Sequence, residues 1–281
     1  MGAMRGEPRS TRFDASAARK SARVLKLHRL GDSVSTQLWN GLTPMRESFD
    51  ARLMKFAGFS PAAIKFLKGL DVAKNNNKAW FDKNRSTYEA ELLEPSKAFV
   101  VALGEKINKF SPEVQAEPKV NGSIFRINRD IRFSKDKTPY NPHMSYWFWE
   151  GADKRGGNAS GYYLRLTKNK VMLGGGMHGM SKEVLERFRK AVADDGRGET
   201  LVKLLKAAGK AGYEAGGAHY KRVPKGYDPE HARADLLRHN ALYVGADFSH
   251  PDSIGKASFA TWCAGHFKKL AGVQAWLASL S

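Results

Sequence analysis

The chain has 281 residues, of which 42% are hydrophobic, so it can bury a substantial core and is not wholly disordered. Its single cysteine, Cys263, excludes an intrachain disulfide, and no apolar run approaches the roughly 18 residues that span a bilayer. We therefore expect a cytoplasmic protein with no membrane partner. The net charge of +19 favours a polyanion or a phosphorylated ligand, with a merely solvated basic surface as an equal alternative.

The first part of the chain is predicted to be a basic arm, residues 1–53. Residues 1–30 hold eight Lys and Arg against two Asp and Glu, a net charge of +6, and they lack a sustained apolar period. A transit peptide has a similar composition, although Glu7 and Asp14 count against one. We expect this arm to be disordered and residues 54–281 to form one domain, which keeps most of the positive charge.

Helices are expected at both ends of this domain. Ser60 followed by Pro61 is a typical helix start, and the asparagines at 75–77 precede a second helical stretch that Pro95 interrupts or restarts. Trp80 and Tyr88 lie on one face of that stretch and are interpreted as packing residues. Further helices are predicted at 181–195, 199–212, 229–239 and 254–280.

The middle of the chain is predicted to form strands. Runs rich in aromatic and branched residues occupy 123–133, 143–150, 161–168, 170–178 and 241–245. Residues 150–161 are expected to form a loop, and Gly174–Gly176 a structural kink or bulge at the end of a strand. The pattern predicts a single α+β domain with a central, mainly antiparallel sheet flanked by N-terminal and C-terminal helices.

The first predicted strand is unusually charged. Residues 126–137 hold five basic and two acidic residues. Strand alternation places Arg129 among apolar residues, on the face assigned to the core, and places Arg126, Asp130 and Arg132 on the opposite face. A buried guanidinium cannot lose its proton, so Arg129 requires acceptors, and Asp130 would point away from it.

The same stretch resembles a family signature, Arg126-x-x-Arg129-Asp130-x-Arg132-Phe133-x-x-Asp136-Lys137-x-x-Tyr140. It is similar to that of a bacterial domain-of-unknown-function family of conserved hypothetical proteins, also found in some eukaryotes. The passages NNNKAWFDKNRSTYE, VMLGGGMH and KRVPKGYD extend the resemblance over roughly residues 58–281. The resemblance implies one compact domain of about this length and names no activity or cofactor.

We predict an anion-binding site around this strand. The candidate residues are Arg126, Arg132, Lys137 and Lys225 for the anion, Arg129, Asp130 and Asp136 as organising residues, and Tyr140 and His143 as catalytic candidates. The histidines are scattered without a metal-binding motif, so no metal site is predicted.

Three functional hypotheses remain open from the sequence. The first is a pocket for a phosphorylated or other anionic small molecule, with or without catalysis. The second is a nucleic-acid-binding module that uses the basic surface. The third is a structural ion-pair network in a protein-interaction domain. Oligomeric state and reaction are not specified by the sequence.

Overall fold

A six-stranded sheet with strand order β1-β2-β3-β4-β6-β5 forms the centre of the protein, and every neighbouring pair is antiparallel. The structure is a computed structural model that describes residues 55–151 and 159–280; the predicted arm, and most of the predicted loop at 150–161, lie outside these residues. The strands are β1 Val114–Gln115, β2 Met144–Glu150, β3 Ser160–Leu166, β4 Lys170–Met177, β5 Glu214–Ala218 and β6 His239–Ser249. The predicted α+β class is confirmed.

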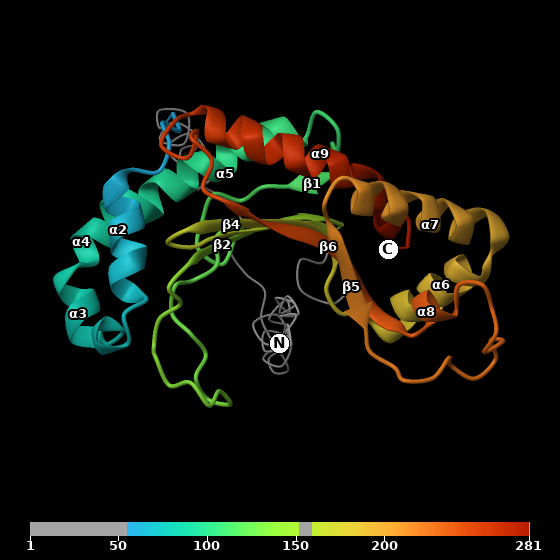
Figure 1. Cartoon of the computed structure of the whole chain (residues 1–281). Coiled ribbons are helices and arrows are strands. Elements are labelled where there is room, and N and C mark those ends of the chain that lie inside the picture. The colour runs from blue at the N-terminus through green and yellow to red at the C-terminus, as the bar shows by residue number, and fades with distance from the viewer. Residues whose placement is uncertain (1–54, 152–158, 281) are drawn as a thin grey trace, which may run out of the picture.

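Helices precede and follow the sheet in the chain, as predicted, and further helices lie between strands β4 and β6. Figure 1 shows α5 and α9 above the sheet, α2 to α4 at one end, and α6, α7 and α8 at the other. The long α9 packs on the central strands β3 and β4. The bounds are α2 Pro61–Leu70, α3 Lys78–Lys83, α4 Arg85–Thr87, α5 Glu94–Ile107, α6 Lys182–Ala193, α7 Asp195–Lys210, α8 Ala234–Leu237 and α9 Ser258–Ala278.

Local capping explains where several helices begin. The Ser60 hydroxyl accepts from the amide of Ala63 at 3.1 Å, and Asn77 accepts from the amide of Trp80 at 2.9 Å. Before Pro95 the helix widens into a π-helical turn, Tyr88–Leu93, which agrees with the expected interruption because proline cannot donate to the preceding turn.

The predicted helix at 229–239 is wrong over most of its length, since only α8 is helical. Side chains capture the backbone amides that a helix would need. The Asp228 carboxylate accepts from the amide of Glu230 at 2.9 Å, and the His231 ring accepts from the amide of Arg233 at 3.0 Å. Asp and His therefore stabilise turns here in competition with the helix.

The register of the sheet divides its side chains between two faces. One row of partners, Tyr146, Leu164 and Leu173, is fully buried against the helical layer. Because successive residues alternate, the next row lies on the opposite face. That row reads Trp147, Tyr163, Gly174, Gly245 and Glu214 from β2 to β5. A further row on the same face reads Trp149, Gly161, Gly176, Tyr243 and Gly216.

Glycines on this second face let neighbouring strands approach closely. A Cβ atom on Gly176 would lie 2.3 Å from the carbonyl oxygen of Leu242, and one on Gly161 would lie 2.1 Å from that of Phe148. The run Gly174–Gly176 lies near the end of β4, as predicted, but it pairs regularly with β6, so the predicted bulge is wrong. Glycine is needed at Gly176 for the close approach of β4 to β6, and at Gly161 for that of β3 to β2.

Candidate functional site

Residues 126–140, here called the charged hairpin, do not form the predicted strand. The chain turns back on itself, so that Asn128 pairs with Tyr140 in an isolated antiparallel bridge. The amide of Asn141 donates to the carbonyl of Ile127 at 2.8 Å, which closes the hairpin at its base. The expected apolar face is absent from this segment, because Phe125 is 42% and Phe133 79% exposed. Alternation alone did not reveal that the segment reverses.

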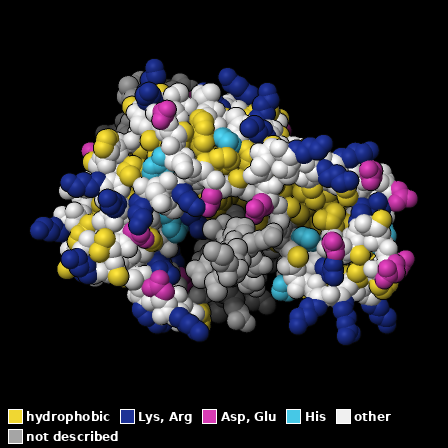
Figure 2. Space-filling view, viewed as in Figure 1, with side chains coloured by type: hydrophobic (Ala, Val, Ile, Leu, Met, Phe, Trp, Pro, Cys, Tyr) yellow, Lys and Arg dark blue, Asp and Glu magenta, His cyan; other side chains and the backbone are white. Residues whose placement is uncertain are grey.

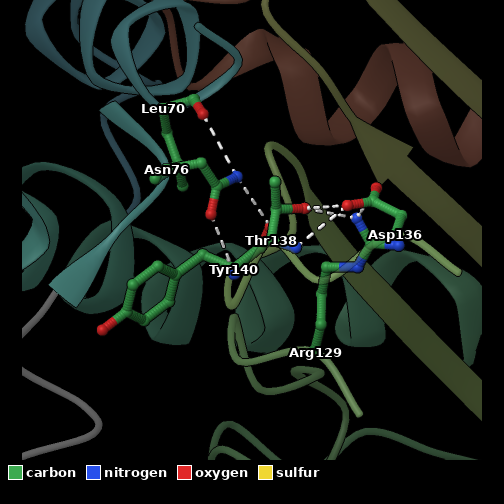
Figure 3. A network of polar contacts seen from close by, with 6 residues as sticks. All are labelled: Leu70, Asn76, Arg129, Asp136, Thr138 and Tyr140. Atoms are coloured by element: carbon green, nitrogen blue, oxygen red, sulfur yellow. Dashed lines mark hydrogen bonds and ion pairs between the residues drawn. The ribbon is translucent and has the colours of Figure 1, made fainter. Parts of the chain in front are cut away.

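Arg129 holds the two arms of the charged hairpin together (Figure 3). Its Nη1 donates to the carboxylate of Asp136 and, at 2.7 Å, to the hydroxyl of Thr138. The same carboxylate accepts from the backbone amide of Thr138 at 2.9 Å. The Thr138 hydroxyl also donates to this carboxylate, at 2.7 Å. The two bonds from Thr138, followed by that from Arg129, lower the pKa of Asp136 to about 2. Arg129 thus has the acceptors that its partial burial requires, although Asp136 is 53% exposed rather than buried.

Arg132, Asp130 and Lys137 also bond within the hairpin. Arg132 makes a forked contact with Asp130, with Nε to Oδ1 at 3.0 Å and Nη2 to Oδ2 at 2.8 Å. Lys137 donates to the carbonyl of Ile131 at 3.0 Å. These contacts agree with the structural part of the third hypothesis. Arg132 is nevertheless 63% exposed, so its outer edge faces solvent.

Two cations of the hairpin have no recorded acceptor in the described part of the chain, namely Arg126 and Lys135, and both are exposed. Lys135 follows Phe133 by two residues, whereas Arg126 lies at the base of the hairpin, next to Ile127. The ring of Phe133 lies 5.8 Å from the guanidinium carbon of Arg132. The tip of the hairpin therefore presents an exposed aromatic ring close to a positive charge.

Asn76 attaches the charged hairpin to the N-terminal helices (Figure 3). Its side chain accepts from the amide of Tyr140 at 3.0 Å and donates to the carbonyl of Tyr140 at 3.0 Å and of Leu70 at 3.3 Å. The Tyr140 ring stacks on Phe81 with centroids 4.2 Å apart, and burial raises the pKa of its hydroxyl. Tyr140 is thus built into the packing, and half-buried His143 follows it at the hairpin base. The role of Asn76 was missed, because its partner lies 64 residues away.

Lys225 is not brought to the charged hairpin. It lies in the segment between β5 and β6, which Figure 1 shows at the opposite end of the sheet from the hairpin. Figure 2 shows Lys and Arg side chains at both of these ends, at the lower left and the lower right of the view. The predicted anion-binding residues are therefore divided between two places.

An aromatic surface on the second face of the sheet begins beside the hairpin. Its half-buried members are Trp147, Tyr163 and Tyr243. Phe125 packs edge-on against Tyr163 with centroids 6.0 Å apart. The Tyr163 hydroxyl bonds Ser145 at 2.8 Å and accepts from Nε of Arg165 at 3.1 Å. The signal for this surface was present in the alternation of MSYWFW and GYYLRL, but the sequence did not tell which face the helices cover.

Neither metal ligation nor membrane insertion is indicated among the described residues. Their His, Cys, Asp and Glu side chains do not gather into groups of three that could hold a metal ion. None of their helices is both long and apolar enough to cross a bilayer. Cys263 is fully buried, and burial raises the pKa of its thiol, which suits a core residue and not a nucleophile.

Comparison with known proteins gives one family. The model described as "Conserved hypothetical protein (DUF2461)" matches residues 62–276, which span the sheet, the helices on both sides of it and the charged hairpin. None of the curated proteins compared with the chain matches it.

Proposed function

The chain belongs to this family of conserved hypothetical proteins, and we propose that it binds single-stranded nucleic acid through the charged hairpin. The observation that carries the proposal is Phe133, which is 79% exposed at the hairpin tip with a guanidinium beside its ring. Exposing a phenylalanine to water is unfavourable unless a ligand covers it. An aromatic ring among cations matches a strand that offers bases and phosphates together.

The internal bonds of the hairpin support this role. Arg129 and its acceptors fix the two arms, so the tip is positioned before a ligand arrives and less entropy is lost on binding. Arg126 and Lys135 have no recorded acceptor within the described residues and remain available to phosphates. An anionic small molecule would use the same cations but would gain little from Phe133, which lies at an exposed tip.

The test is binding of a labelled single-stranded oligonucleotide, followed by fluorescence anisotropy over a range of salt concentrations. Phe133→Ala should weaken binding roughly ten-fold, because stacking on one base contributes about 1–3 kcal/mol. Arg126→Gln should reduce the slope of log affinity against log salt by about 0.7, the loss of one phosphate contact. Lys206→Gln, on the exposed side of α7, is the matched control and should change neither.

Two results would overturn the proposal. One is the absence of binding at low salt by a protein whose thermal melt shows that it is folded. The other is an equal effect of Lys206→Gln and Arg126→Gln, which would mean that only net charge matters. Stabilisation by phosphorylated metabolites, with no loss in Phe133→Ala, would favour the small-molecule hypothesis instead.

A further inference from the structure

A second cluster with the chemistry of the hairpin tip lies after β5. Tyr220 is 41% exposed, and the guanidinium carbon of Arg189 from α6 lies 5.1 Å from its ring. The corresponding distance at the hairpin, from Arg132 to Phe133, is 5.8 Å. At each of the two sites, the guanidinium of a neighbouring arginine thus lies close to an exposed aromatic ring.

Hydrogen bonds hold the backbone of this cluster, and several of its cations have no recorded acceptor among the described residues. The amides of His219 and Tyr220 both donate to the carbonyl of Arg238, at 3.0 and 2.9 Å. Nε of Arg189 is buried and has no hydrogen-bond acceptor among the described residues. Three exposed cations follow without a recorded acceptor in the same part of the chain: Lys221, Arg222 and Lys225. We call residues 219–225 the Tyr220 loop.

The aromatic surface of the sheet runs between the hairpin and the Tyr220 loop. From β2 to β5 there are four steps between neighbouring strands, or about 19 Å at roughly 4.8 Å each. Trp147, Tyr163 and Tyr243 lie along this path. Two acids also lie on this face of the sheet. Asp247 forms an ion pair with Lys170 at 3.5 Å, and Glu214 lies on the edge strand β5. Cations therefore mark the two ends, and aromatic rings mark the middle.

Resting on the function proposed above, we infer that the Tyr220 loop is a second anchor for the same single strand. The strand runs from the charged hairpin to the Tyr220 loop, with phosphates held at both ends and one base stacked on each of the exposed rings, Phe133 and Tyr220. A single strand that covers this path of about 19 Å falls within the range of roughly 4–16 nucleotides that single-strand-binding proteins cover. A duplex would not fit this arrangement, because its bases are already stacked on one another.

The experiment compares oligothymidylates of about four and about 16 nucleotides with wild type, Phe133→Ala, Tyr220→Ala and the double variant. One long oligomer should bind per wild-type chain, more tightly than the short one because two linked contacts raise the effective concentration. Each single variant should weaken long-oligomer binding roughly ten-fold. The double variant should bind the long oligomer no better than wild type binds the short one. Lys225→Gln provides a second test of the loop that leaves its aromatic ring in place.

The outcomes separate this inference from the proposed function. If Phe133→Ala weakens binding while Tyr220→Ala and Lys225→Gln do not, the second anchor is wrong and the hairpin function stands. Two long oligomers per chain would show independent sites and overturn the inference. Equal competition by a duplex, or by polyglutamate of the same charge, would also overturn it and point to a duplex or an acidic protein. If no oligonucleotide binds to the folded protein, the proposed function itself fails.

Discussion

Replacing Asn76 with Ala tests how the charged hairpin is held. The substitution removes bonds to both the amide and the carbonyl of Tyr140, which is only 5% exposed, and to the carbonyl of Leu70. A buried polar group left without a partner costs about 1–3 kcal/mol. Two such groups on Tyr140 and a weaker loss at Leu70 give a destabilisation of about 3 kcal/mol. For a domain of this size that corresponds to a fall in melting temperature of roughly 6–12 °C.

Asn75→Ala is the matched control, since Asn75 makes one recorded bond, from Nδ2 to the carbonyl of Gly69 at 3.0 Å, and is half-buried. It should cost about 1 kcal/mol, or roughly 2–4 °C. Thermal unfolding followed by circular dichroism measures both variants. Limited proteolysis should also cut Asn76→Ala within the charged hairpin before it cuts wild type. If the two variants melt within a degree of each other, Asn76 does not attach the hairpin as argued.

Three further results are expected. Gly176→Ala should destabilise the protein by at least about 2 kcal/mol, because the new Cβ would lie 2.3 Å from a carbonyl oxygen. Gly209→Ala on α7, whose Cβ would meet nothing within 4 Å, should instead stabilise the protein by roughly 0.5–1 kcal/mol. Equal denaturation midpoints for the two variants would contradict this. Asp136 has a pKa of about 2 in the folded chain against 3.8 as its ordinary value, so its contribution to stability is present above 3.8 and is lost as the pH falls toward 2. Asp136→Asn should flatten the stability curve in that window, and an unchanged slope would count against the depressed pKa. Cys263, buried with a raised pKa, should react with a thiol reagent only as fast as the protein unfolds; rapid labelling of the native protein would show that the site opens.

The sequence predicted those elements whose determinants are local. Ser60 and Pro61 indicated the start of α2, and Ser181, which accepts from the amide of Val184 at 3.3 Å, indicated that of α6. The aromatic strands β2 and β3 were likewise predicted from their composition. The edge strand β5, with the sequence EAGGA, has no such signal and was missed.

The charged hairpin shows why the rest could not be predicted. Alternation gave Arg129 a core position and correctly required acceptors for it, but the acceptors come from Asp136 and Thr138 across a reversal of the chain. Tertiary bonds from Asn76 decide where that reversal ends. The division of the predicted site between Arg126 and Lys225 has the same cause, since sheet order and not sequence distance sets which loops meet.

The closed base of the charged hairpin makes this segment a module. Its recorded polar contacts join Arg129 to Asp136 and Thr138, Arg132 to Asp130, and the backbone of Asn141 to that of Ile127. A peptide of residues 127–141, cyclised where these two backbones already meet, would carry most of the bonds that shape the tip. The segment could therefore be transplanted into an unrelated scaffold, or supplied as a free cyclic competitor, with Phe133 still presented beside Arg132 but without Arg126, which lies outside it.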